Sequence, residues 1–157
     1  MIVNPQLIPE EGVTVTGEED PSIIDIVDPS TSFHSPITYR LRLLRTGQIL
    51  LVRGSLQTTG SFVCSRCLKE FTGPIRVEEF GREKELGPDE GKIDLTPDIR
   101  EDIILAIPAK PLCRADCRGI CPLCGKDLNR GECGCAAAEI DSPFARLDRI
   151  KVKKPKG

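Results

Sequence analysis

The cysteines constrain this chain more than any other feature, because its eight cysteines fall into four close pairs. Two or three residues separate the partners in the first three pairs, and one residue separates them in the last. Zinc binds four soft ligands in a tetrahedron, and a spacing of two residues lets one tight turn aim two thiolates at one ion. The pattern therefore predicts two four-thiolate sites. The candidate ligands are Cys64, Cys67, Cys113, Cys117, Cys121, Cys124, Cys133 and Cys135.

The spacing favours one site made by the last two pairs and another made by the first two. Cys121-Pro-Leu-Cys124-Gly125 resembles a zinc-ribbon knuckle, in which the glycine allows backbone amides to approach the sulfurs. The other site would join Cys64 and Cys67 to a segment far along the chain. Spacing alone leaves other partitions open. Because the cysteine-dense segment has few apolar residues, we expect chelation to unfold it.

Other cysteine chemistries fit less well than two zinc ions. A disulfide framework needs an oxidising compartment, which no feature of the sequence supports. A redox pair usually precedes a helix that lowers a thiol pKa, but Gly73-Pro74 follows Cys64 and Cys67. An iron–sulfur cluster, or one zinc ion with free thiols, stays open.

Composition suits one core with a small appended module. Of the 157 residues, 39% are hydrophobic, 29% are charged and only 4% are aromatic. So few aromatics argue against a platform on which single-stranded bases stack. No apolar run approaches the length of a membrane span, and the first residues lack the features of a signal peptide. We therefore expect a cytoplasmic protein without a membrane partner, and no small-molecule substrate is evident.

Alternating residues predict an antiparallel β meander after residue 36. Tyr39, Leu41 and Leu43 alternate with Arg40 and Arg42, so a strand there would bury the apolar set and expose the arginines. Before them, Val13-Thr-Val-Thr is a possible strand. Further strands are expected over 49–56, 61–64 and 74–80, with turns at 46–47, 59–60 and 72–73, and a loop over 81–93.

One helix is expected to begin at Thr96-Pro97, with Thr96 as its cap, and to end before Pro108. Its isoleucines share one face, and acids such as Glu101 and Asp102 are assigned to the solvated side. A last short helix is expected from Ser142-Pro143, followed by a basic tail.

The expected fold class is α+β. It comprises a mostly antiparallel β meander or barrel-like domain, one amphipathic helix and a C-terminal cysteine-rich zinc module. The expected parts are a Pro-rich acidic segment (1–35), the meander plus helix (36–110), the zinc module (111–141) and a short helix with a basic tail (142–157).

No catalytic residues stand out. A catalytic zinc keeps one position open for water and usually has a histidine or carboxylate ligand, whereas four-thiolate sites are closed. The only histidine, His34, is far from every cysteine pair in the sequence. Phosphate-binding loops and hydrolase motifs are also absent from the sequence. We expect a protein that is not an enzyme.

The order of motifs resembles one known family. A strand leads into Cys64-x-Arg-Cys67, and an isoleucine-rich helix ends at Ala106-Ile107-Pro108. There follow Cys113-x3-Cys117-Arg-Gly-Ile-Cys121-Pro-x-Cys124-Gly-x-Asp-Leu-Asn129, then Cys133-x-Cys135, then Pro143-Phe-Ala-x-Leu147. Over roughly residues 38 to 151 this resembles the YceD family, the large ribosomal RNA subunit accumulation proteins. The resemblance implies a role in making or stabilising large-subunit (23S) ribosomal RNA, and it brings no catalytic residues.

Taken with the charge pattern, the resemblance suggests a partner. Basic residues cluster on the meander and in the tail, and they could contact phosphates of pre-ribosomal RNA. The alternative is an adaptor that holds a ribosomal protein through its zinc module, because the first 30 residues carry seven acids and no Lys or Arg. The candidate RNA contacts are Arg40, Arg42, Arg45, Arg53, Arg66, Arg76, Lys151, Lys153 and Lys154.

Overall fold

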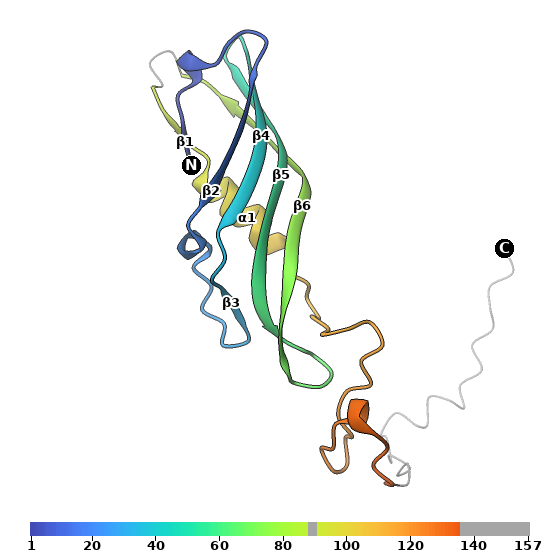
Figure 1. Cartoon of the computed structure of the whole chain (residues 1–157). Coiled ribbons are helices and arrows are strands. Elements are labelled where there is room, and N and C mark those ends of the chain that lie inside the picture. The colour runs from blue at the N-terminus through green and yellow to red at the C-terminus, as the bar shows by residue number, and fades with distance from the viewer. Residues whose placement is uncertain (88–90, 136–157) are drawn as a thin grey trace, which may run out of the picture.

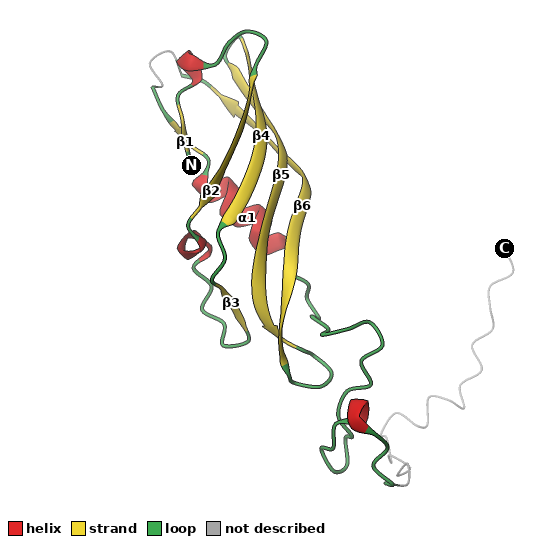
Figure 2. Cartoon of the chain, in the orientation of Figure 1, coloured by secondary structure: helices red, strands yellow, loops and turns green. Residues whose placement is uncertain are grey.

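The computed structural model describes residues 1–87 and 91–135, and Figures 1 and 2 show how its elements are arranged. The expected helix after Ser142-Pro143 and the basic tail lie outside the described residues. The strands are β1 (Ile2–Val3), β2 (Val13–Glu19), β3 (Thr31–Phe33), β4 (Ile37–Thr46), β5 (Ile49–Val63), β6 (Glu70–Glu85) and β7 (Ile93–Asp94). The helices are α1 (Thr96–Leu105) and three short 3-10 turns, η1 (Pro5–Leu7), η2 (Pro21–Ile24) and η3 (Leu128–Arg130).

The sheet is built around β5, which pairs along both of its sides. On one side β4 pairs with its first part and β3 with its last part, while β6 follows the other side. Strand β2 adds to the free side of β4, so all five strands are joined and every pairing is antiparallel. The prediction of a mostly antiparallel β fold with one helix is therefore confirmed.

The sheet is open, and the expectation of a barrel-like domain was wrong. Within residues 1–87 and 91–135, β2 pairs only with β4, and β6 pairs only with β5. The inner face does not need closure because α1 lies across it (Figure 1). A helix covering one face of an antiparallel sheet buries the apolar side while the other side stays exposed to solvent.

The core lies between the inner face of the sheet and α1. Leu41 and Leu43 on β4 are buried while Arg40 and Arg42 are exposed, which confirms the alternation that the sequence predicted. From α1, Ile99 and Ile103 are fully buried against the sheet. Each such side chain contributes about 1.5–3 kcal/mol to folding by leaving water.

Two expected turns are absent because their glycines serve packing instead. Strand β5 continues through Gly60 and β6 through Gly73, and these two residues face each other across the ladder. A Cβ on Gly60 would lie 2.6 Å from the Phe62 ring and 2.9 Å from the Phe33 ring. These glycines therefore leave room for an aromatic cluster in which the centroids of Phe33 and Phe62 are 6.2 Å apart.

Two acids on α1, Asp98 and Asp102, form ion pairs. The sequence predicts Asp102 on the solvated side of the helix, and this prediction was wrong. Arg82, on a part of β6 that was expected to be a loop, places its Nε 3.1 Å from Asp98 Oδ1 and its Nη2 2.5 Å from Asp102 Oδ1. Burial opposes the charge of Arg82, yet the Asp102 and Asp98 carboxylates raise the pKa of its guanidinium. Lys84 adds a second cation, 2.9 Å from Asp98. These contacts fix α1 to β6.

The N-terminus of α1 is capped differently from the prediction. Thr96 was the expected cap, but Asp94 Oδ1 accepts a hydrogen bond from the backbone N–H of Thr96.

Candidate metal centres and nucleic-acid interface

The two Cys-x-x-Cys segments form the same turn twice. In the first, the Leu68 N–H donates to the Cys64 carbonyl at 2.9 Å, and the Cys64 N–H donates to the Lys69 carbonyl at 2.9 Å. In the second, the Gly125 N–H donates to the Cys121 carbonyl at 2.9 Å, and the Cys121 N–H donates to the Lys126 carbonyl at 2.8 Å. Each knuckle thus presents its two sulfurs from one rigid turn.

The first group of four sulfurs, site 1, consists of Cys64, Cys67, Cys113 and Cys117, and all four lie within 4.8 Å of one another. The Sγ atoms of Cys64 and Cys117 are 3.8 Å apart, and those of Cys67 and Cys113 are 3.7 Å apart. A tetrahedron with metal–sulfur bonds of about 2.3 Å has edges of about 3.8 Å. The spacing of the sulfurs therefore fits a single tetrahedral metal ion.

Backbone amides favour negative charge on the first knuckle. Burial alone would raise the pKa of the Cys64 thiol, but N–H donors from Cys113, Cys67 and Arg66 lower it to about 6. For Cys113, burial and the neighbouring thiols raise the pKa to about 12. Four thiols this close cannot all ionise without a cation among them, which is the condition that a bound metal ion satisfies.

The second group, site 2, consists of Cys121, Cys124, Cys133 and Cys135, whose sulfurs also lie within 4.8 Å of one another. N–H donors from Cys124 and Leu123 lower the pKa of Cys121 to about 6. Cys124 and Cys135 are exposed, whereas Cys64, Cys67 and Cys117 of site 1 are buried. Both groups match the partition that the spacing favoured.

Site 1 joins the cysteine-rich segment after α1 to the end of the sheet. Two of its ligands, Cys64 and Cys67, lie in the β5–β6 connection, and the other two, Cys113 and Cys117, follow α1. Arg66, between Cys64 and Cys67, donates from Nη1 to the Cys117 carbonyl at 2.8 Å, and its own carbonyl accepts from the Ile120 N–H at 3.1 Å. A Cβ on Gly119 would lie 2.9 Å from the Arg66 carbonyl oxygen, and its φ of +77° also favours glycine. Arg66, one of the predicted phosphate contacts, therefore holds the cysteine-rich segment through its hydrogen bond to the Cys117 carbonyl.

Two residues beside the cysteines were not selected from the sequence. Asn129 donates from Nδ2 to the Cys117 sulfur at 3.5 Å and to Asp127 Oδ1 at 2.8 Å. Asp127 in turn accepts a hydrogen bond from Lys69, which follows the first knuckle. The sequence feature that could have identified them is the Asp-x-Asn spacing just after a Cys-x-x-Cys pair. Short polar side chains at such positions can form hydrogen bonds with nearby backbone groups and with cysteine sulfurs.

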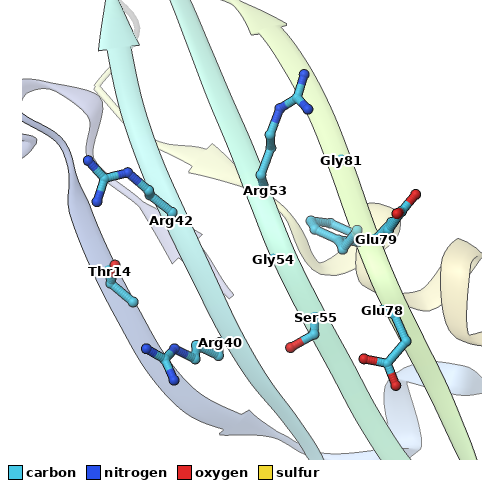
Figure 3. Close-up of a pocket in the computed structure, with 10 residues that line it drawn as sticks. Thr14, Arg40, Arg42, Arg53, Gly54, Ser55, Glu78, Glu79 and Gly81 are labelled. Carbon is cyan, nitrogen blue, oxygen red and sulfur yellow. The ribbon is translucent and has the colours of Figure 1, made fainter.

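Three candidate arginines share the outer face of the sheet. Arg40 and Arg42 on β4 and Arg53 on β5 line one shallow depression of about 660 Å³ (Figure 3). Arg42 and Arg53 are partners across the ladder. Arg42 donates to the Glu11 carbonyl at 2.8 Å, and none of the three forms an ion pair in the part of the chain that the structure describes. We call this group the arginine face.

Glutamates border the arginine face on β6. The ladder shifts register between Gly54 and Leu56, so Glu78 and Glu79 together lie opposite Ser55. This bulge exposes two consecutive acids, which line the same depression (Figure 3). The outer face is therefore basic on β4 and β5 and acidic on β6.

The remaining candidate cations lie elsewhere. Arg45 is exposed near the β4–β5 turn, where its Nε donates to the Gly47 carbonyl at 3.3 Å. Arg76 is exposed on β6, opposite Gln57. Lys151, Lys153 and Lys154 lie outside the described residues. His34 is exposed between β3 and β4, and it belongs to neither cysteine group.

No helix in residues 1–87 and 91–135 is both long and apolar enough to cross a membrane.

Comparison with known proteins identifies a matching family model and several similar proteins. The family model of the large ribosomal RNA subunit accumulation protein YceD matches residues 78–151. An uncharacterized protein of Mycobacterium tuberculosis is 33% identical over 124 residues, which cover 68% of this chain and 58% of the relative. An Arabidopsis thaliana protein, large ribosomal RNA subunit accumulation protein YCED homolog 1, chloroplastic, is 23% identical over 158 residues, covering 74% of this chain and 49% of the relative. The chain thus spans only about half the length of these relatives. No solved structure matches the chain.

Proposed function

This chain belongs to the YceD family, and on that premise we propose that it is a non-catalytic factor that supports the accumulation of large-subunit (23S) ribosomal RNA. It acts by binding pre-ribosomal RNA during assembly of the subunit. The names of the matching family model and of the Arabidopsis relative support the process, and the arginine face supports the mode of binding. We place this activity in the cytoplasm.

The arginine face is the observation that carries RNA binding. Three arginines line one depression on neighbouring strands, and in the described part of the chain none of them is ion-paired, although Glu78 and Glu79 line the same depression. Arginine donors match phosphate oxygens in geometry and in charge, and counterions are released from RNA when such contacts form. Glu78 and Glu79 repel phosphates from the part of β6 that borders the depression, so the RNA backbone follows β4 and β5 there. Arg45 and Arg76 extend the contact beyond the depression.

Zinc is the metal that the two cysteine groups suit best. All eight ligands are thiolates, which are soft donors, and each group fills a tetrahedron without an open position. In a cluster of several irons, cysteines bound to different irons lie well apart, whereas all four sulfurs of each group here lie within 4.8 Å of one another. Closed four-thiolate sites give no place for a metal-bound water, which supports structural ions and the proposal of a non-catalytic protein. Elemental analysis of the purified protein tests for two zinc ions per chain.

The RNA surface is tested with a double variant and a matched control. Arg40→Ala/Arg53→Ala removes two exposed guanidinium groups, neither of which makes a hydrogen bond within the described residues. We expect weaker binding to every RNA sequence and a salt dependence flatter by up to about 1.5 in its logarithmic slope. Glu78→Gln/Glu79→Gln changes the same depression and should leave binding intact or strengthen it. Equal affinity of the arginine variant and the unmodified protein for RNA would show that the arginine face is not the RNA surface.

The second candidate function is a zinc-stabilised adaptor that holds a ribosomal protein and affects RNA indirectly. The acidic N-terminal segment favours it, because Glu10, Glu11, Glu18, Asp25 and Asp28 are all exposed. Such a surface is complementary to a basic ribosomal protein. Capture of partners after nuclease treatment distinguishes the two functions, since only the adaptor keeps its partners without RNA.

A further inference from the structure

We propose that Asn129, together with Asp127, couples the two metal sites, so that an ion in either site raises the affinity of the other. This inference concerns metal loading and does not depend on RNA binding. It rests on a chain of hydrogen bonds that runs from a ligand of site 1 to the segment between the ligands of site 2.

The Asn129 carboxamide is held in one orientation at site 1. Its Oδ1 accepts from the Arg118 N–H and from Arg114 Nη2, both at 2.8 Å. Its Nδ2 is thereby directed at the Cys117 sulfur, 3.5 Å away. An N–H donor beside a thiolate stabilises its negative charge and fixes its direction. A metal ion at site 1 requires Cys117 as a thiolate, and the bond to Asn129 is strongest in that state.

Asp127 connects Asn129 to the first knuckle. Its Oδ1 accepts from the backbone N–H of Asn129 at 2.9 Å and from Asn129 Nδ2 at 2.8 Å. Its other oxygen accepts from Lys69, which follows the first knuckle. The Lys69 hydrogen bond, with those from Asn129, holds the pKa of Asp127 well below its ordinary value. Asp127 is therefore an anion that connects Asn129 to Lys69, next to the first knuckle.

The same residues order the chain around site 2. Residues 127–129 lie between Cys124 and Cys133, and Asp127 forms a β-bridge with Ile120, the neighbour of Cys121. The Leu128 N–H also donates to the Gly119 carbonyl at 2.9 Å. Only Cys121 of the four site 2 ligands is buried, so little apolar packing positions the rest. An ion at site 1 fixes Asn129 and Asp127, and this reduces the conformational entropy that the chain loses when site 2 binds.

The test is a thermodynamic cycle in metal titrations of the full chain, with Zn²⁺ against a competing chelator and Co²⁺ absorption as a second signal. Cys64→Ser/Cys67→Ser disables site 1, and Cys124→Ser/Cys135→Ser disables site 2. We expect the overall constant for two ions to exceed the product of the two single-site constants by at least about tenfold. Adding Asn129→Ala to all three proteins should bring this factor close to one, although every ligand is kept.

Two controls keep the result interpretable. Arg130→Ala removes a largely exposed side chain whose Nε is 3.7 Å from Asp127, and it should leave the factor unchanged. The circular dichroism of the sheet checks that the variant lacking site 1 stays folded; if it does not, the comparison of Asn129→Ala with the unmodified protein still measures affinity at intact ligand sets. A factor near one in the unmodified protein, or a factor that Asn129→Ala does not change, overturns the proposal.

Discussion

Leu68 and Gly125 occupy the same position in the two knuckles, each directly after the second cysteine, with φ of 59° and 72°. Both backbones are left-handed, a conformation that glycine adopts freely and that costs other residues about 1–2 kcal/mol. Leu68 gains little in return from packing, because its side chain is 63% exposed. The first knuckle therefore stores strain that the second does not.

Reciprocal substitutions should move stability in opposite directions. Leu68→Gly relieves the strain, and we expect it to stabilise the metal-loaded protein by about 0.5–1 kcal/mol after the entropy of the added glycine is subtracted. Gly125→Ala should destabilise by about 1–2 kcal/mol. Thermal unfolding of the loaded protein measures both. Equal destabilisation by the two changes would contradict a strained first knuckle.

Arg82 should be the most sensitive charged residue of the sheet. Its side chain is 23% exposed, and those of Asp98 and Asp102 are 11% and 15% exposed. Arg82→Met leaves two largely buried carboxylates without their main cation, and we expect a loss of about 2–4 kcal/mol in denaturant unfolding. Glu101→Gln removes an exposed partner of the same arginine and should cost less than about 1 kcal/mol. If both variants lose a similar free energy of unfolding, the burial of Asp98 and Asp102 does not determine the strength of these ion pairs.

The N-terminus of α1 should weaken in acid. Hydrogen bonds from the side chain and then the backbone of Thr96 lower the pKa of Asp94 below its ordinary value. The ionised form is therefore favoured by folding, and its contribution is complete above about pH 4 and is lost as the pH falls through the lowered pKa. The Asp94→Asn variant has no carboxylate to protonate at this position. Its free energy of unfolding should therefore fall less than that of the unmodified protein between about pH 4 and pH 2. The measurement is denaturant unfolding with chelator present throughout, so that metal release contributes to neither protein. Glu83→Gln, an exposed change on β6, is the control and should follow the unmodified protein.

Chelation should release the cysteine-rich segment and spare the sheet. Among the described residues, the segment after α1 shares only a small buried cluster with the β5–β6 connection, around Cys64, Cys67 and Cys117, whereas the sheet has its own apolar core. Removing the metal therefore leaves residues 111–135 without their main stabilising interaction. We expect proteases to cut this segment first while residues 1–87 stay resistant. Unchanged digestion after complete removal of metal would show that the ions are not structural.

In cells, the protein should associate with large-subunit precursors through charge. Sedimentation of extract through a sucrose gradient at low salt should place the protein with these particles, and moderate salt should release it. If it stays at the top of the gradient under both conditions, the adaptor function becomes the better explanation.

The parts of the fold that follow from local rules could be predicted from the sequence. Alternation around Leu41 is a period of two imposed by the pleat, and Ile99 and Ile103 lie one turn apart on the buried side of the helix. The two cysteine groups follow from the reach of a two-residue turn. Prediction failed for residues that contact a part of the chain distant from them in the sequence. Gly60 was assigned to a turn because the sequence does not show that Phe33 packs against it, and Asp102 was assigned to solvent because nothing in the sequence brings Arg82 beside it.

The length of β5 has a mechanical consequence. This strand carries Arg53 near one end and leads directly into Cys64 at the other, and Val63 lies ten positions after Arg53. At about 3.3 Å per residue, the strand keeps the two places roughly 30 Å apart. A ladder bonded along both sides resists bending, so β5 serves as a spacer. A molecule held on the arginines leaves the knuckles free, and a single copy of the protein has the span to touch two separate places on one large particle.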